Sequence, residues 1–172
     1  MDHPFNHDLQ AVLDADAAYA FLPEGSWLSG GCGLLAESLH RLISDSDIFV
    51  VQQLDHGFPD HVVVRVTCGL EIVYLDYSGV QTEDELIAAW RDECRGASIQ
   101  LCSLADAHAA GINTGEVLCQ GHLVSPFCRY LLGNLGRSMR SAAIPCGRTR
   151  RSFLGHPWVE LGARAYDKVP VF

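Results

Sequence analysis

The stretch SWLSGGCGLLAESLHRLI, residues 26–43, places one cysteine among three glycines, directly before an apolar segment. Gly30 and Gly31 permit a sharp turn of the backbone, because glycine has no Cβ. The segment that follows has apolar residues at the spacing of a helix with one buried face: Leu34, Leu35, Leu39, Leu42 and Ile43. We therefore predict a helix that begins at Cys32 and ends at the polar residues 44–47.

The position of Cys32 favours a nucleophile. Unpaired N–H groups and the helix dipole stabilise a thiolate at a helix N-terminus, and the thiolate is the reactive form of cysteine. Gly31 leaves room for a substrate carbonyl, whose oxyanion the amide of Cys32 can bind. Ser29 or Ser26 is the expected second oxyanion donor, with Trp27 beside them as a substrate-positioning residue. The alternative is that Cys32 is an inert buried thiol at a turn.

Two β-rich runs, residues 61–66 and 71–76, predict a hairpin with a short glycine-containing loop. If the turn is centred between Cys68 and Gly69, residues whose numbers sum to 137 face each other, which sets His61 opposite Asp76. Directly opposed Cβ atoms lie about 5 Å apart. The carboxylate then holds the imidazole in one tautomer while the other ring nitrogen faces the thiol. A slip of one residue in register would separate the two side chains.

The rest of the chain adds helices and strands around this pair. Thr82 and Glu85 have the spacing of a capping box, which marks the start of a helix. The predicted helices cover residues 8–21, 82–94, 104–110 and 127–139, and the further predicted strands cover residues 48–51 and 99–103. Residues 141–172 predict loops with a final edge strand. The prediction is an α+β domain in which the helix carrying Cys32 packs on an antiparallel sheet. All 172 residues fit one domain, since domains have roughly 100–200 residues.

Charge is distributed unevenly along the chain. Residues 1–128 carry four arginines and nineteen acidic residues, a balance of −15, whereas residues 129–172 have a balance of +6. The basic segment either packs on the acidic body of its own chain or offers a surface for an acidic protein partner. Sparse aromatic residues and the absence of a nucleic-acid motif argue against nucleic acid. No apolar run reaches the roughly 18 residues of a membrane helix, and the first ten residues do not form a signal peptide, so a cytoplasmic protein is expected.

The seven cysteines are widely spaced and odd in number, which predicts buried thiols rather than a disulfide framework. Cys119 and His122 have the local spacing of metal ligands, but no second close pair completes a zinc site. No metal or other cofactor is therefore expected. Among the other histidines, His56 is the best alternative base, because it lies in the loop before His61.

Three segments carry a resemblance to a known group: residues 25–40 around Cys32, residues 61–66, and residues 74–80 around Asp76. They resemble small papain-like-fold cysteine proteins related to the NlpC/P60 group, of the type found in bacteria and their mobile elements. The likeness covers residues 24–92 and leaves the last 80 residues unassigned, including the basic segment 129–172. The resemblance implies a cysteine at the start of the central helix, a histidine beginning a strand and a polar residue on the next strand.

Carried over by motif, Cys32 is the nucleophile, His61 the base and acid, and Asp76 the orienting group. Two features depart from the group. Ser26 stands six residues before the cysteine, where papain-like peptidases often have an oxyanion-binding glutamine, and only 29 residues separate Cys32 from His61. The first departure puts efficient proteolysis in doubt, and the second implies a minimal version of the fold.

The predicted function is hydrolysis or acyl transfer at a peptide, isopeptide or carboxamide bond of a protein or peptide substrate, through a Cys-His-Asp triad. The group that the chain resembles also includes inactive binding modules, and fold analogy does not select a substrate. The alternative function is therefore an inactive papain-like binding module that holds an acidic protein through its basic C-terminal region.

Overall fold

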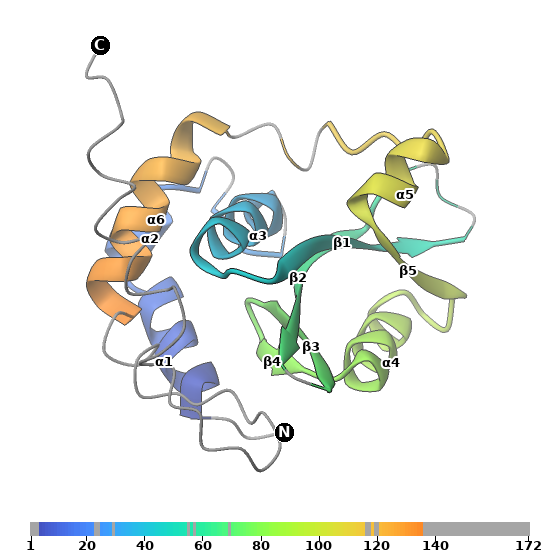
Figure 1. Cartoon of the computed structure of the whole chain (residues 1–172), viewed down its shortest axis with the longest axis horizontal. Coiled ribbons are helices and arrows are strands. Elements are labelled where there is room, and N and C mark those ends of the chain that lie inside the picture. The colour runs from blue at the N-terminus through green and yellow to red at the C-terminus, as the bar shows by residue number, and fades with distance from the viewer. Residues whose placement is uncertain are drawn as a thin grey trace.

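A computed structural model describes residues 4–22, 25–28, 30–54, 56, 58–68, 70–115, 118 and 121–135. These residues form an α+β fold with a five-stranded antiparallel sheet of order β4-β3-β2-β1-β5 (Figure 1). The strands are β1 (Ser46–Gln53), β2 (His61–Cys68), β3 (Glu71–Asp76), β4 (Gly79–Gln81) and β5 (Ile99–Ser103). The helices are α1 (Pro4–Leu13), α2 (Asp16–Tyr19), α3 (Gly31–Leu42), α4 (Glu83–Glu93), α5 (Leu104–Ala109) and α6 (Gly121–Leu135).

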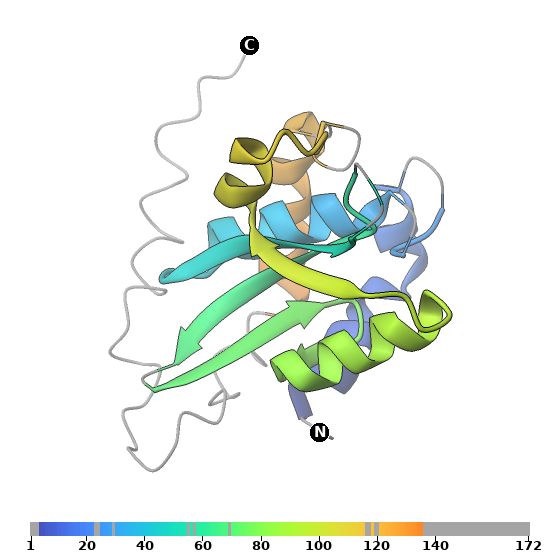
Figure 2. The same ribbon diagram turned by 90° about the vertical axis from the view of Figure 1, so that its right-hand side faces the viewer.

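Each face of the sheet has its own apolar core, as the alternation of side chains along a strand requires. On one face, Val62 and Val64 of β2 share a core with Leu35 of α3 and with α1 and α6. On the other face, Val63 and Tyr74 share a smaller core with Leu86 of α4. Figure 2 shows the sheet between α3 and α4. The long apolar run in β2 is therefore explained by burial on both faces.

The predicted central helix is confirmed as α3, which starts at Gly31, one residue before Cys32. Gly30 caps it with φ +84°, a left-handed conformation that glycine adopts without the steric penalty of a side chain. A Cβ on Gly31 would lie 2.6 Å from Leu22 Cδ2 and 2.7 Å from the Ser26 carbonyl oxygen. The two glycines are thus required by the backbone turn and by close packing.

The predicted hairpin is present, but its register differs by two residues from the prediction. Cys68 pairs with Glu71, and the ladder runs to Val64 opposite Leu75, so paired residues sum to 139 rather than 137. His61 is therefore not directly opposite Asp76. Because side chains alternate with a period of two, an even shift leaves both side chains on the same face of the sheet. They become diagonal neighbours instead of a direct pair.

Other element boundaries also differ from the predictions. The N-terminal segment forms α1 and α2 with a break at Asp14–Ala15 rather than one helix over 8–21. The short strand β4 was not predicted, and α6 starts at Gly121, before the predicted 127, and contains Pro126. The capping box at Thr82 and Glu85 is confirmed, with both reciprocal hydrogen bonds present. The predicted loops and edge strand at 141–172 lie outside the described residues.

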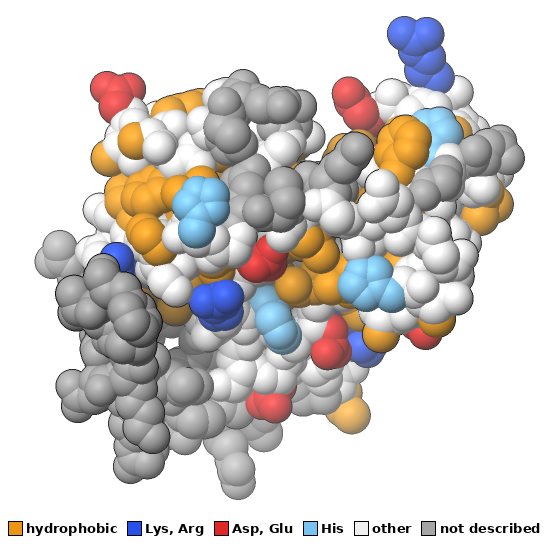
Figure 3. Space-filling model, turned by 90° about the horizontal axis from the view of Figure 1, so that it is seen from above, with side chains coloured by type: hydrophobic (Ala, Val, Ile, Leu, Met, Phe, Trp, Pro, Cys, Tyr) orange, Lys and Arg blue, Asp and Glu red, His pale blue; other side chains and the backbone are white. Residues whose placement is uncertain are grey.

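Within the described part of the chain, no helix is both long and apolar enough to cross a membrane. Figure 3 shows one face of the molecule, on which hydrophobic, acidic, basic and histidine side chains are interspersed. The arginines of the basic C-terminal segment beyond residue 135, including Arg148, Arg150 and Arg151, lie outside the described residues.

Candidate active site

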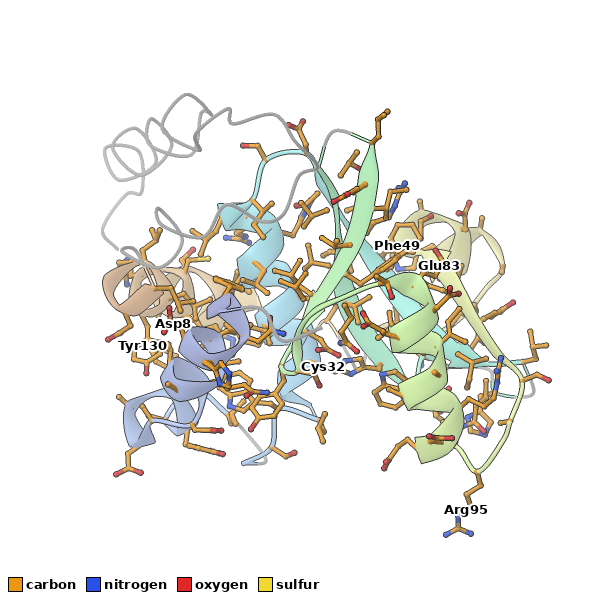
Figure 4. The ribbon with its side chains drawn as sticks, turned by 90° about the horizontal axis from the view of Figure 1, so that it is seen from below. Asp8, Cys32, Phe49, Glu83, Arg95 and Tyr130 are labelled. Atoms are coloured by element: carbon orange, nitrogen blue, oxygen red, sulfur yellow. The ribbon has the colours of Figure 1, made fainter. Side chains whose placement is uncertain are left out.

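Cys32 lies in the first turn of α3, and Figure 4 shows it between α1 and α4. Its side chain is buried, with 5% of the residue's surface exposed. The backbone N–H groups of Val62 in β2 and Gly33 in its own helix lie near the sulfur and lower the pKa of the thiol. The start of α3 is therefore joined directly to the start of β2, which brings the thiol to His61.

His61 is the first residue of β2 and is completely buried. Its Nε2 lies 3.1 Å from Asp76 Oδ2, within hydrogen-bond distance. Its Nδ1 is buried with no hydrogen-bond partner among the described residues. Since Nε2 is engaged by the carboxylate, Nδ1 is the ring nitrogen that remains for the thiol and for a reacting group.

Asp76 ends β3 and is held on both of its carboxylate oxygens. Oδ1 accepts the Ser78 backbone N–H at 2.7 Å and the Gln81 side-chain amide at 2.9 Å, while Oδ2 faces His61. The turn that follows is supported by α1, because the Val80 N–H donates to Asn6 Oδ1 at 2.8 Å. These hydrogen bonds therefore fix the orientation of the carboxylate independently of its contact with the imidazole.

The charges of the site favour a thiolate beside an imidazolium. Burial raises the pKa of the Cys32 thiol, but the neighbouring His61, together with the two backbone N–H groups, outweighs burial, so that this pKa is lowered. Burial lowers the pKa of His61, but the hydrogen bond that its Nε2 makes to Asp76 and the proximity of the Cys32 thiol outweigh burial and raise the pKa to about 9. Each group thus stabilises the charged form of the other.

The other thiols provide a contrast. Burial raises the pKa of Cys94, Cys102 and Cys128, and acidic neighbours add to this at Cys94 and Cys102. These three cysteines and Cys32 are free thiols. Among the cysteines whose side chains the structure describes, Cys32 alone has a lowered pKa.

The residues predicted to bind the oxyanion and position the substrate lie in two places, the turn before α3 and the apolar core. Gly31 precedes Cys32 and donates its N–H to the Ser26 carbonyl at 3.1 Å. Ser26 Oγ accepts the Leu28 N–H at 3.2 Å, which closes the turn before α3. Trp27 is buried in the core, where its indole stacks on Phe127 and donates to the Leu13 carbonyl. Ser29 lies outside the described residues.

Sequence reasoning missed two side chains of the site. Trp90 of α4 stacks on the His61 ring, with ring centroids 4.5 Å apart and planes 26° apart. Gln81 of β4 pairs across the sheet with Tyr74, and its amide donates to Asp76. The apolar stripe of the predicted helix 82–94 includes Trp90, but nothing in that stripe indicates what the ring covers.

His56, the alternative base, belongs to a separate network. Its Nδ1 lies 2.9 Å from Asp60 Oδ1 and 3.2 Å from the Gln53 amide nitrogen, and its ring stacks on Phe58. Asp60 also accepts the Gln53 N–H, so these contacts brace the loop that leads into β2. His56 is thus held by its own carboxylate. Within the described ranges, no three His, Cys, Asp or Glu side chains are grouped as metal ligands.

A scan against protein-family models and searches of curated proteins and of solved structures found no match to this chain.

Proposed function

We propose that this chain is a cysteine-dependent hydrolase or acyltransferase that acts on a peptide, isopeptide or carboxamide bond. The observation that carries the proposal is the lowered pKa of Cys32, set beside a fully buried His61 that a carboxylate orients. Nucleophile, base and orienting group are the parts that thiol-based acyl transfer requires. Buried groups whose pKa values are shifted by a specific charged neighbour are typical of catalytic sites.

The arrangement supports a mechanism in two stages. The Cys32 thiolate attacks the carbonyl carbon, and the oxyanion that forms accepts the amide N–H of Cys32, which is at a helix position without an intrahelical partner. The imidazolium of His61 donates its Nδ1 proton to the leaving amine, so the carbon–nitrogen bond breaks and a thioester remains. Water or another amine then attacks the thioester, His61 accepts its proton, and the thiolate is released.

The order of the elements supports a papain-like relationship as part of this proposal. A helix that starts at the nucleophile packs on an antiparallel sheet, the base begins one strand, and the orienting carboxylate ends the adjacent strand. This is the order that the resemblance in residues 24–92 implies. The short separation of Cys32 and His61 is accommodated because β1 alone intervenes between α3 and β2.

The proposal is tested by alkylation of the folded protein with iodoacetamide near neutral pH, followed by mapping of the modified cysteines. Cys32 should react faster than Cys94, Cys102 or Cys128, because the pKa of Cys32 is lowered and the pKa values of the other three are raised, so that Cys32 has the larger thiolate population. His61→Ala should abolish the preference. His56→Ala is the matched control and should leave it unchanged. Equal reactivity of Cys32 and the other thiols in the folded protein would rule out the catalytic proposal.

A further inference from the structure

We infer that the substrate is a primary carboxamide, the side chain of a glutamine residue, and that the leaving group is ammonia. The inference rests on the proposed function and selects one of its three bond types. It follows from how completely the base is enclosed rather than from the identity of the triad.

The imidazole that must protonate the leaving group is closed on several sides. His61 has 0% of its surface exposed, against 5% for both Cys32 and Asp76. Asp76 occupies the Nε2 side, and the Trp90 indole covers one face of the ring. The single polar position left on the ring is Nδ1, which is buried and without a partner. A leaving nitrogen must therefore reach an enclosed Nδ1.

This enclosure discriminates between leaving groups. In a peptide bond, the leaving nitrogen carries a Cα and the rest of the chain, which must continue past His61 and Trp90. In an isopeptide bond, it carries the side chain of a lysine. In a primary carboxamide, it carries hydrogen atoms alone, so nothing extends beyond the nitrogen. Of the peptide, isopeptide and carboxamide bonds, the carboxamide has the leaving group that best fits beside a base with no exposed surface.

The depth of the nucleophile favours glutamine over asparagine. Because Cys32 is nearly buried, the carbonyl carbon must reach below the surface while the main chain of the substrate stays outside. The two methylene groups of glutamine carry the carboxamide one carbon farther from its main chain than the single methylene of asparagine.

The reaction balances with water as the second reactant. The Cys32 sulfur bonds to the carboxamide carbon, the carbon–nitrogen bond breaks, and the nitrogen leaves as ammonia with the proton from His61. Water then adds to the γ-glutamyl thioester, His61 accepts a proton, and the carbon–sulfur bond breaks. A glutamine side chain and water give a glutamate side chain and ammonia, with no oxidant, reductant or cofactor.

The test uses two probes with the same acyl group. Full-length protein is incubated with benzyloxycarbonyl-Gln-Gly, from which ammonia and benzyloxycarbonyl-Glu-Gly are measured, and with the matched γ-anilide, from which the aniline is measured. We expect ammonia release at least about tenfold faster than anilide cleavage, since steric exclusion from a pocket commonly discriminates by about that factor or more. Cys32→Ala should abolish both reactions. Equal or faster cleavage of the anilide would overturn the inference.

Trp90 provides an independent test of the enclosure. Trp90→Ala should raise the ratio of anilide to carboxamide turnover at least about tenfold, because it opens the space beside the His61 ring. Trp90→Phe keeps a stacked ring and should keep the wild-type ratio. An unchanged ratio in a folded Trp90→Ala protein would contradict the inference.

The outcomes separate this inference from the proposed function. Preferential alkylation of Cys32 without ammonia release from the carboxamide would refute the glutamine substrate and leave the thiol chemistry standing. Loss of preferential alkylation would refute both. Cleavage of a peptide bond in the probe, detected as free glycine, would also overturn the carboxamide assignment.

Discussion

At the scale of single residues, His61 is the unusual group. An imidazole without exposed surface ordinarily loses its charge, because burial lowers its pKa. Here the carboxylate of Asp76 and the thiol of Cys32 outweigh burial and raise the pKa to about 9. The charge of the imidazole is therefore maintained by its two neighbours, and each neighbour can be removed separately.

Asp76→Ala should lower the reactivity of Cys32, although it leaves the cysteine itself unchanged. Loss of the carboxylate lowers the pKa of His61, which raises the pKa of Cys32 and should slow alkylation of Cys32 at pH 7 about tenfold or more. The measurement is the pH–rate profile for alkylation, whose midpoint should move to higher pH. Gln81→Ala removes one hydrogen bond to Asp76 and should cause a smaller shift in the same direction. A profile for Asp76→Ala identical to wild type would show that Asp76 does not act through His61.

The three residues proposed to take part in the reaction could be predicted from the sequence. The residues that contact and position them could not. The glycines around Cys32 and the paired β-rich runs were enough to single out Cys32, His61 and Asp76, and the structure brings these three side chains together. Trp90 and Gln81 carry no such signal. Their contacts depend on how α4 and β4 pack on the sheet, which the spacing of residues along the chain does not determine.

At the scale of elements, the start of α3 sets the position of the thiol. Gly30 turns the chain in a left-handed conformation, and Gly31 fits against Leu22 and the Ser26 carbonyl with no room for a methyl group. The sequence predicted the turn from its glycines. The close contacts at Gly31 depend on a loop that folds back on itself, and they appear only in three dimensions.

Gly31→Ala should therefore destabilise the protein and displace the thiol. The added methyl would meet the Ser26 carbonyl at 2.7 Å, and overpacking of this kind costs about 1–3 kcal/mol of unfolding free energy. Urea unfolding measures the loss, and alkylation measures the lower reactivity of Cys32. Gly133→Ala in α6 is the matched control, because its methyl would meet nothing within 4 Å and alanine in a helix adds roughly 0.5–1 kcal/mol. Equal effects of the two substitutions would contradict the packing argument.

The hairpin shows what its sequence could and could not determine. The two β-rich runs predicted strands at the correct places, but the assumed turn centre was one residue too early, so the register was wrong by two. Because the error was even, His61 and Asp76 still share a face of the sheet. Alternation of side chains was therefore the reliable part of the argument, and direct opposition was not.

At the scale of the whole molecule, the fold class was predictable and the boundaries were less so. A helix followed by antiparallel strands indicated an α+β fold, which is observed. The break between α1 and α2 and the early start of α6 were not predicted. Helix α6 packs against α3, α1 packs against α6 and β4, and these helices share one core. Tertiary contacts decide where such helices begin and end.

The coupled titration of Cys32 and His61 predicts how stability depends on pH. His61 contributes stability that is complete below pH 6.5, its ordinary pKa, and is lost as the pH rises through about 9. Cys32 contributes stability that is complete above pH 9, its ordinary pKa, and is lost as the pH falls through its lowered value. Between pH 6.5 and about 9 the two dependences oppose each other, so the wild-type stability should change little with pH from this pair.

Cys32→Ala removes one of the two dependences. The hydrogen bond that His61 Nε2 donates to Asp76, the largest of the causes that raise the pKa of His61, remains in this variant. Its unfolding free energy, measured in urea, should therefore fall as the pH rises from 6.5 to 9 more steeply than that of wild type. A profile for Cys32→Ala that is as flat as the wild-type profile would contradict the coupling.

The thiol and its base come from parts of the chain that meet only when α3 packs on the sheet. Before this contact forms, the thiol of Cys32 lacks the histidine that lowers its pKa in the folded protein. An unfolded or partly synthesised chain would therefore carry seven ordinary cysteines and would not modify its surroundings. In the proposed mechanism, assembly of the fold is therefore the step that activates the thiol, and the preference for labelling Cys32 over the other thiols would report the fraction of folded molecules.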